Sequence, residues 1–343
     1  MKLLRFLLFP FAVLYDAITR IRNWFFNLGV LKSTSFDIPV IAVGNLSVGG
    51  TGKSPQIEYL IRLLKDDYKI AVLSRGYKRK TEGFQLVNDT HIAEDVGDEP
   101  LQFYKKFKND ITVAVDADRT YGIQQLLQTH NPPEVVLLDD AYQHRKVTAS
   151  SYILLTKYND LFVDDFLLPT GNLRESRRGA KRASVIVVTK CPENLSKAEQ
   201  EKIVRKLNPK SYQKVFFTTI AYDEDLKGTE ELVISDLKDK EVLLVTGIAN
   251  PKPLLNFLKE KEIGFKHLNF PDHHNFTQQD ISTIKKSFDE LLSQQKIILT
   301  TEKDYMRLEG KIDPLNYISI KSDFLNEEKV FNSLVLEEIK KKN

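Results

Sequence analysis

Residues 44–55, Gly-Asn-Leu-Ser-Val-Gly-Gly-Thr-Gly-Lys-Ser-Pro, constrain the fold of this chain more than any other stretch. An apolar, β-branched run (38–43) precedes them, and apolar residues at helical spacing (57–64) follow. A glycine-rich loop between a buried strand and a helix is typical of a phosphate-binding loop, because its backbone N–H groups and the helix start surround phosphate oxygens. This context predicts that Lys53 reaches the β- and γ-phosphates of a nucleotide and that the Ser54 hydroxyl holds Mg²⁺.

One position of this loop departs from the standard spacing, since Ser47 stands where the first glycine is expected. Gly49 and Gly50 still allow backbone turns that a Cβ would obstruct. An ordinary strand-to-helix turn is the alternative interpretation, but Gly-Lys-Ser directly before a helical pattern favours the nucleotide site. The residues expected to bind the nucleotide are Ser47, Val48, Gly49, Gly50, Thr51, Gly52, Lys53 and Ser54.

Length, charge and cysteine content exclude several classes of protein. A chain of 343 residues exceeds the usual size of a single domain, so two domains are expected. The net charge of +3 is too small to indicate nucleic acid as a partner. The single cysteine, Cys191, excludes an internal disulfide and a cysteine-rich metal site, which suits a reducing compartment. Its place before Pro192 at a strand end favours a structural role.

Residues 1–30 differ in character from the rest of the chain. An apolar run extends over 6–15, aromatic residues follow at 24–26, and the flanking cations are Lys2, Arg5, Arg20 and Arg22. The run is shorter than the roughly 20 residues that span a bilayer, and no signal-peptide cleavage site follows it. This composition is typical of a helix that lies in a membrane interface. Packing on the protein's own core and a short or tilted membrane span stay open as alternatives.

Apolar runs alternate with helical patterns from residue 38 to residue 190, as buried parallel strands alternate with helices in doubly wound proteins. This pattern predicts an α/β fold of the P-loop NTPase type, with a mostly parallel sheet whose ligands bind at the carboxyl ends of the strands. The expected strands are 39–43, 69–74, 111–115, 134–138, 152–156 and 184–189, and the expected helices are 56–65, 99–107 and 119–128.

A second alternation predicts a smaller C-terminal α/β domain. Its expected elements are strand 242–246, helix 253–261, strand 265–270, helix 280–293, strand 296–299, a return strand near 317–320 and a final helix from 327. The predicted organisation is a membrane-associating helix (1–30), a P-loop core domain (31–212), a linker strand (213–224) and the smaller domain with the return strand and terminal helix (225–343).

Two carboxylates, Asp139 and Asp140, end the apolar run at residues 135–138. In P-loop proteins a carboxylate at such a strand end holds Mg²⁺, directly or through water, and capping of the next turn is the alternative. Gln143 and His144 follow closely and are expected to share this site. His144 fits a structural histidine equally well.

Asp98 stands in the sequence Val-Gly-Asp-Glu-Pro (96–100), directly before a helical pattern. Aspartate is a favoured N-cap residue, and Glu-Pro suits the first turn of a helix. From spacing alone, capping is therefore a better explanation of Asp98 than catalysis.

Two loops carry clusters of cations. Arg174 lies in Leu-Pro-Thr-Gly-Asn-Leu-Arg-Glu (168–175), shortly before Arg177 and Arg178, and Arg75 begins a basic stretch in the loop at 74–80. Arginine pairs well with phosphate and carboxylate, so both loops favour a polyanionic ligand. Solvated basic loops are the alternative.

His273 and His274 follow Asp272 in the second domain, between a predicted strand and a predicted helix. Such a group could bind a metal, or the aspartate could orient a histidine for proton transfer. Residues 300–304, Thr-Thr-Glu-Lys-Asp, close the next strand, where they either line the cleft between the domains or cap a helix.

Taken together, these segments resemble one family, the tetraacyldisaccharide 4′-kinases of Gram-negative bacteria. Each short motif is weakly specific, whereas their occurrence in the family's order along most of the chain is specific. Ser47 also matches the family's form of the loop. The segments that carry the resemblance are 44–55, 74–77, 96–100, 116–119, 139–144, 168–175, 270–274 and 301–304.

The resemblance implies transfer of the γ-phosphoryl group of ATP, with Mg²⁺, to the 4′-hydroxyl of a tetraacyldisaccharide 1-phosphate (lipid A disaccharide 1-phosphate), which yields lipid IVA. It implies that Asp98 is the catalytic base, aided by His273. It places Ser54, Asp139 and Glu175 near Mg²⁺. The residues that it assigns to the substrate or to support of the site are Arg75, Arg119, Asp140, Gln143, His144 and Arg174.

Two positions depart from the family pattern. Ala-Tyr at 141–142 replaces an expected glycine and aliphatic residue, which affects local packing more than chemistry, and family members vary at His274. Residues 1–30 are similar to the family's membrane-facing helix. The resemblance therefore implies a protein at the cytoplasmic face of the inner membrane, with a lipid substrate, no nucleic acid and no obligate protein partner.

Two other classes of function remain as alternatives. A soluble P-loop kinase of small molecules would share the loop and Asp98 but would not need residues 1–30. A P-loop ATPase that acts as a partner-binding switch would hydrolyse the nucleotide without an acceptor. The sequence contains no Asn-Lys-x-Asp guanine motif, and its single cysteine argues against metal delivery.

Overall fold

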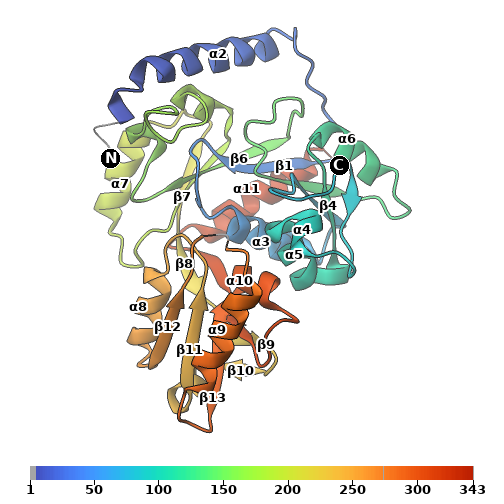
Figure 1. The fold of residues 1–343 in the computed structure, drawn as a ribbon. Coiled ribbons are helices and arrows are strands. Elements are labelled where there is room, and N and C mark those ends of the chain that lie inside the picture. Colours follow the sequence, from blue (N-terminus) through green and yellow to red (C-terminus); the bar gives the residue numbers. More distant parts are fainter. Residues whose placement is uncertain (1–4, 273, 343) are drawn as a thin grey trace. The chain divides into compact units, whose positions relative to one another are not determined.

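The computed structural model describes residues 5–272 and 274–342, which form two compact units (Figure 1). The larger unit comprises residues up to 91, 95–220 and 322 onward, and the smaller comprises 92–94 and 221–321. Each unit is built around its own β-sheet.

The larger unit contains a nine-stranded sheet in the order β15-β8-β7-β6-β1-β5-β2-β4-β3, so β1 lies near its centre. Neighbouring strands from β8 to β4 are parallel, and β3 pairs antiparallel at one edge. This arrangement confirms the predicted doubly wound α/β fold. The strands are β1 (Val40–Asn45), β2 (Ile70–Ser74), β3 (Gln85–Leu86), β4 (Ile111–Val115), β5 (Val135–Asp139), β6 (Ser151–Lys157), β7 (Val185–Thr189), β8 (Lys214–Tyr222) and β15 (Ile320–Phe324).

The central strands are apolar on both faces because helices and loops cover both sides of the sheet. Helix α3 packs on β1 and β5, α5 packs on β4 and β2, and α6 packs on β2 and β4. The helices of this unit are α2 (Phe9–Asn27), α3 (Lys53–Leu64), α5 (Asp98–Phe107), α6 (Arg119–Leu127), α7 (Lys197–Leu207) and α11 (Glu328–Lys340), together with the short α4 (Ala93–Val96), which crosses the division between the units. Short 3₁₀ turns lie at η1 (Lys108–Asp110), η2 (Phe162–Asp164) and η3 (Arg177–Arg182).

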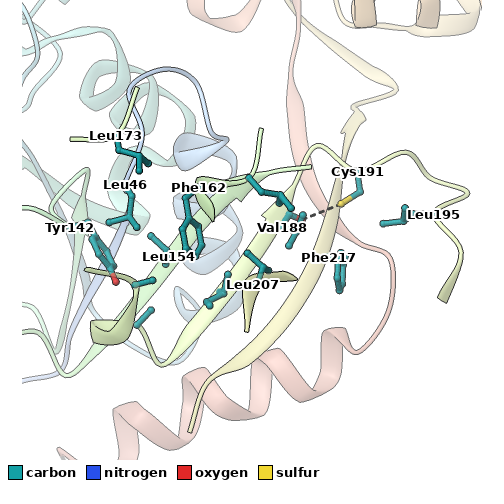
Figure 2. Close-up of a cluster of buried hydrophobic side chains, with 14 residues drawn as sticks. Leu46, Tyr142, Leu154, Phe162, Leu173, Val188, Cys191, Leu195, Leu207 and Phe217 are labelled. Atoms are coloured by element: carbon teal, nitrogen blue, oxygen red, sulfur yellow. Dashed lines mark hydrogen bonds between the residues drawn. The ribbon is translucent and has the colours of Figure 1, made fainter. Parts of the chain in front are cut away.

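One buried cluster lies directly beneath the nucleotide-binding loop (Figure 2). Leu46 from that loop packs there with Leu173 and Tyr142, and strand β7 contributes Val188. Since these side chains are almost fully buried, the loop is fixed to the sheet by apolar packing as well as by the backbone.

The smaller unit contains a six-stranded sheet in the order β10-β9-β14-β13-β11-β12. Its central pairs are parallel, as the alternation of strands and helices predicts, whereas β9 pairs antiparallel with β14 and β10. Its elements are β9 (Asp225–Gly228), β10 (Leu232–Val233), η4 (Ile234–Asp239), β11 (Glu241–Thr246), α8 (Lys252–Glu260), β12 (Phe265–Asn269), α9 (Gln278–Asp289), β13 (Lys296–Thr301), α10 (Glu302–Leu308) and β14 (Asn316–Ile318).

The prediction that the terminal helix belongs to the smaller domain is wrong. Helix α11 belongs to the larger unit, because β15 returns the chain to that unit's sheet beside β8. Phe331 of α11 is fully buried against Phe216 and Tyr59, and the Tyr59 hydroxyl lies 2.7 Å from Asn332 Oδ1. The apolar face of the helix is periodic in sequence, but the partner of that face is set only by tertiary contacts.

Candidate active site

The loop at residues 46–52 has the strand–loop–helix context of a phosphate-binding loop. It leaves β1 at Asn45, and α3 begins at Lys53. Gly49 and Gly52 have φ angles of 102° and 85°, a left-handed conformation that glycine adopts without steric cost. Asn45 Nδ2 donates to Thr51 Oγ1 at 2.8 Å and so ties the two ends of the loop together. The backbone amides of the loop and of the helix start are thus available in one place for phosphate oxygens.

The basic loop at 168–175 lies along this phosphate-binding loop. Val48 N donates to Asn172 O at 2.8 Å, and Arg174 N donates to Leu46 O at 2.7 Å. These backbone bonds bring the Arg174 side chain to the acid pair: Arg174 Nη1 lies 3.1 Å from Asp140 Oδ2. The basic loop at 168–175 therefore lies where a phosphate ligand of the neighbouring loop would come close, and its predicted polyanionic ligand stays a prediction.

Asp140 stands between two cations. Lys53 Nζ is 3.6 Å from Asp140 Oδ1, and Arg174 Nη1 lies 3.2 Å from the same oxygen and 3.1 Å from Oδ2. Burial alone would raise the pKa of Asp140, but Lys53 and Arg174 hold this pKa below its ordinary value. Asp140 is therefore ionised at neutral pH and holds Lys53 at the start of α3, where a nucleotide's terminal phosphates would approach.

Asp139 has the free oxygen that a metal site requires. Its Oδ2 accepts a 3.0 Å hydrogen bond from Ser74 Oγ, whereas its buried Oδ1 has no hydrogen-bond partner among the described residues. Burial raises the pKa of Asp139 to about 6, and Asp140 acts in the same direction. An unpartnered buried oxygen of this kind fits Mg²⁺ or a water bound to it, since Mg²⁺ prefers oxygen ligands.

No group of three His, Cys, Asp or Glu side chains suited to a metal ion occurs within residues 5–272 and 274–342. Mg²⁺ usually takes one or two carboxylates from the protein and completes its shell with water and substrate phosphates. Ser54, another of the three predicted ligands, is the second residue of α3 and lies partly exposed.

Three further predicted residues gather beside the acid pair. Arg119 is only 2% exposed, and its Nη2 donates to the main-chain oxygen of Asp139 at 3.2 Å. Burial lowers the pKa of Arg119 to about 10 and that of His144 to about 4, so the former stays charged and the latter neutral at pH 7. The exposed Arg75 contributes to both shifts, which indicates that its charge is near.

Glu175 is engaged by four N–H groups in the described structure. Its oxygens accept from Arg182 Nη1 at 2.9 Å and Nη2 at 2.6 Å, from Gln143 Nε2 at 3.1 Å and from Asn23 Nδ2 at 3.2 Å. The carboxylate is only 1% exposed. It therefore connects helix α2, the acid-pair loop and η3, while its contact with Mg²⁺ stays a prediction.

Asp98 is the first residue of α5, and Gly97 occupies the N-cap position without a side-chain hydrogen bond. The N-cap role that spacing alone favoured for Asp98 is therefore wrong. Gly97, with a φ angle of 96°, packs so closely on the loop after β2 that an added Cβ would lie 3.3 Å from Gly76 Cα. Asp98 is thus held at a tightly packed junction, 7% exposed.

A buried ion cluster connects the helix of Asp98 to the helix of Lys53. Glu58 of α3 is 1% exposed and lies 2.7 Å from Lys106 Nζ of α5. It also accepts from Gln102 Nε2 of α5 and Arg62 Nη2 of α3, each at 2.9 Å. Since α5 begins at Asp98 and α3 begins at Lys53, this cluster fixes two candidate site residues relative to each other.

Two predictions in the smaller unit have different outcomes. His273 lies outside the described residues, so its proposed role stays a prediction. Thr301 is the N-cap of α10 and accepts a hydrogen bond from Asp304 N, which confirms the capping alternative for residues 300–304. His274 Nε2 lies 2.9 Å from Asp280 Oδ2, and its ring stacks on Phe270.

Arg182 and Lys190 also lie at the site, although no sequence motif marks either of them. Arg182 is in η3 and holds Glu175, and Lys190 follows β7 beside the nucleotide-binding loop. The position of Lys190 could have been predicted from the sequence, because it directly follows the predicted strand 184–189. The carboxyl end of that strand lies at the same sheet edge as the nucleotide-binding loop. Arg182 carried no comparable signal, since its partner is found only in the folded chain.

Helix α2 faces the protein with polar groups and presents apolar side chains outward. Tyr15 OH donates to Arg174 O at 2.8 Å, and Asn23 bonds Glu175. The opposite side exposes large apolar side chains, among them Phe11, Leu14, Ile18, Ile21 and Trp24. This inverted pattern contradicts simple packing on an apolar core. No described helix combines the length and the hydropathy needed to traverse a bilayer.

A family model described as tetraacyldisaccharide-1-P 4′-kinase matches residues 4–340. A tetraacyldisaccharide 4′-kinase from Flavobacterium johnsoniae is 55% identical over 343 residues, covering 99% of this chain and 98% of the relative. The enzyme of the same name from Bacteroides thetaiotaomicron is 47% identical over 313 residues, covering 88% of this chain and 82% of the relative.

A solved structure agrees with these matches. The crystal structure of "apo" form LpxK from Aquifex aeolicus in complex with ATP superposes with a TM-score of 0.79 at 32% identity. The similarity covers 98% of this chain and 99% of that one. The family model, the relatives that match over nearly the full length, and the geometry of the loop and acid pair agree with one another. The chain therefore belongs to the tetraacyldisaccharide-1-P 4′-kinase family and is an ATP-dependent kinase.

Proposed function

We propose that this chain transfers the γ-phosphoryl group of ATP to the 4′-hydroxyl of a tetraacyldisaccharide 1-phosphate to form lipid IVA, at the membrane surface. The observation that carries the proposal is the arrangement of the phosphate-binding loop, Lys53 and the acid pair at one sheet edge, in a chain whose relatives are kinases of this acceptor. ATP and Mg²⁺ are the cofactors that this family uses.

The cations of the site neutralise charge rather than form bonds. Phosphoryl transfer depends mainly on positioning and on stabilising charge that spreads over the phosphate oxygens. The loop amides and Lys53 provide this at the nucleotide, while Arg174 and Arg119 keep the acid pair in place through their contacts with Asp140 and Asp139. Lys53 pairs with Asp140, and this contact holds the lysine at the start of α3.

Asp139 and Ser54 are the residues that we expect to hold Mg²⁺, because Asp139 Oδ1 is buried and unpartnered. Bound Mg²⁺ supplies charge neutralisation between the β- and γ-phosphates. Glu175 acts on this centre through Gln143, which donates to both Glu175 and the main-chain oxygen of Asn45. Direct contact of Glu175 with Mg²⁺ would require it to release one of its present donors.

Asp98 is the proposed general base. It accepts the proton of the sugar 4′-hydroxyl as that oxygen bonds to the γ-phosphorus, the bond to the bridging oxygen breaks, and ADP leaves. Its place at the start of α5, fixed to α3 by the Glu58 cluster, supports this role. His273 is proposed to aid this proton transfer, as the family resemblance implies.

Helix α2 is proposed to dock on the cytoplasmic face of the inner membrane. A tetraacylated substrate does not leave the bilayer readily, since each buried CH₂ contributes about 0.8 kcal/mol, so the enzyme must reach it there. The outward apolar face of α2 and its exposed cations Arg20 and Arg22 fit an anionic membrane surface. The contacts of Tyr15 and Asn23 then connect this helix to the loop beside the nucleotide.

The decisive assay measures ³²P transfer from γ-labelled ATP to purified lipid A disaccharide 1-phosphate in detergent. The wild type should label this lipid, and Asp98→Asn should lower kcat by about 10²- to 10⁴-fold while an ATP analogue still binds. Asp110→Asn is a matched control, because Asp110 lies just beyond the end of α5 and is half exposed. ATP hydrolysis without lipid labelling would favour the ATPase alternative and refute the kinase assignment for this acceptor.

The membrane role needs a separate comparison of detergent and vesicles. Ile18→Glu together with Trp24→Glu places charges on the outward face of α2 without touching Tyr15 or Asn23. Activity on substrate embedded in anionic vesicles should fall at least tenfold, whereas activity in detergent should stay within twofold, because only the docking surface changes. Equal losses in both media would refute membrane docking by this face, and no loss in either would favour the soluble-kinase alternative.

A further inference from the structure

Lys190 lies over the nucleotide-binding loop, at the end of strand β7. The preceding residue anchors that strand to the loop, since Thr189 Oγ1 donates to Thr51 O at 2.8 Å. Lys190 Nζ lies 3.9 Å from the position that a Cβ on Gly50 would occupy. The ammonium therefore stands beside the glycines whose amides would face a bound phosphate.

The backbone of Lys190 holds the side chain in this place. Its φ angle is 58°, a left-handed conformation that a lysine rarely adopts. The neighbouring residues fix this turn: Cys191 N donates to Thr218 O at 3.0 Å, and Cys191 Sγ donates to Val188 O at 3.3 Å, as the dashed line in Figure 2 shows. Strained backbone of this kind is common at residues with a functional side chain.

The charges around Lys190 leave room for an anion. Lys157 pairs with Asp160 at 2.7 Å and Lys53 pairs with Asp140, whereas Lys190 forms no ion pair with any described residue. Partial desolvation, followed by repulsion from Lys157 and Lys53, lowers the pKa of Lys190. An anionic ligand placed between these lysines and the loop would relieve the repulsion and give Lys190 the partner that it lacks.

We propose that Lys190 is a second cation of the nucleotide site, which binds the α- and β-phosphates, while Lys53 serves the β- and γ-phosphates. The two lysines are assigned to different phosphates because of their positions. Lys190 lies beside Gly50, where the loop amides would surround the α- and β-phosphates, whereas Lys53 at the helix start would reach the β- and γ-phosphates. Lys190 is a binding residue in this role, so its charge matters for ADP as much as for ATP. The inference rests on the proposed function only through its nucleotide, not through its acceptor.

The test measures nucleotide binding by the full-length protein without lipid. Lys190→Met keeps the aliphatic stem and removes the charge, Lys190→Arg keeps the charge, and Lys197→Met is the matched control from an exposed lysine at the start of α7. By titration calorimetry, Lys190→Met should bind both ADP and a non-hydrolysable ATP analogue at least about tenfold more weakly. Lys190→Arg should restore most of this affinity, and Lys197→Met should bind as the wild type does.

Two further readouts separate a phosphate contact from a structural effect. In turnover, Lys190→Met should raise KM for ATP about tenfold while kcat and KM for the lipid stay within twofold. Adenosine, which lacks phosphates, should inhibit the wild type and Lys190→Met equally. If Lys190→Met is unstable, Lys190→Gly removes the side chain and fits the left-handed backbone, and it should show the same loss of ADP affinity.

Several outcomes would overturn the proposal. ADP affinity equal to that of the wild type in Lys190→Met would remove Lys190 from the site. A loss in Lys190→Arg as large as in Lys190→Met would show that charge is not the cause, and a matching loss for adenosine would assign the side chain to the base instead. Absence of lipid phosphorylation with intact, Lys190-dependent ADP binding would instead refute only the proposed acceptor.

Discussion

Replacing Glu58 by glutamine tests whether the buried ion cluster holds helices α3 and α5 together. The change keeps the shape of the side chain and removes its charge. Lys106 then keeps a positive charge that is only 6% exposed, with its 2.7 Å partner neutralised. Because neutralising one side of a buried pair removes its attraction for the other charge, we expect the free energy of unfolding of the larger unit to fall by about 3–5 kcal/mol.

A double variant and a control test whether this loss of stability comes from the buried charge. Glu58→Leu combined with Lys106→Met removes both charges, so it should cost clearly less than Glu58→Gln alone. Glu201→Gln is the matched control, because Glu201 and Arg205 of α7 form a 3.7 Å pair whose side chains are 70% and 68% exposed. Its effect on the free energy of unfolding should stay within about 0.5 kcal/mol.

The assay is urea unfolding followed by circular dichroism, with kinase activity measured on the folded fraction. Since α3 begins at Lys53 and α5 at Asp98, Glu58→Gln should lower kcat more than it raises KM for ATP. A cost below about 1 kcal/mol, or a double variant less stable than Glu58→Gln, would refute the reasoning from buried charge. An unchanged kcat would show that the cluster does not position Asp98.

Three further predictions concern other parts of the larger unit. Gly44→Ala should lower the free energy of unfolding in urea by about 1–3 kcal/mol, because its Cβ would lie 2.7 Å from Tyr142 Cβ. The control Gly264→Ala meets no atom within 4 Å and should not destabilise the protein. Equal stabilities of the two variants would contradict the packing argument. Cys191 is buried, and burial raises the pKa of its thiol to about 12. Ellman's reagent at pH 8 should therefore label this thiol only after the protein unfolds. Rapid labelling of the native protein would contradict this prediction. Burial lowers the pKa of His144 to about 4, below the 6.5 of an unfolded chain, so acid protonates the unfolded state first. Going from pH 7 to pH 5 should therefore lower the free energy of unfolding about 2 kcal/mol more in the wild type than in His144→Gln. Parallel pH profiles of the two proteins would contradict this prediction.

The order of strands and helices could be predicted from the sequence because it depends on local patterns. The expected strand at 111–115 matches β4, and the expected helix at 119–128 matches α6 to within one residue. The glycine-rich loop was equally readable, since Gly49 and Gly52 adopt the positive φ angles for which glycine is needed. Apolar periodicity and backbone sterics act over a few residues, so the local sequence is sufficient to predict these features.

The meeting of Asp139, Asp140 and Lys53 was also foreseeable. Parallel strands bring their carboxyl ends to the same sheet edge, and the register of β1 with β5 places Val43 beside Asp139. The N-cap of α5 was not foreseeable, because aspartate before a helix is usually a cap, and only the structure places Gly97 at that position. Spacing alone could not separate these two cases.

Only the tertiary structure decided which distant groups became partners. The chain shows an amphipathic pattern at 328–340, but contacts with Phe216 and Tyr59 assign α11 to the larger unit. Glu175 stood near several arginines in sequence, yet the folded chain selects Arg182 and adds Asn23 from α2. Local sequence determines what each segment forms, whereas the pairing of buried charges and apolar faces depends on contacts between segments that lie far apart in the chain.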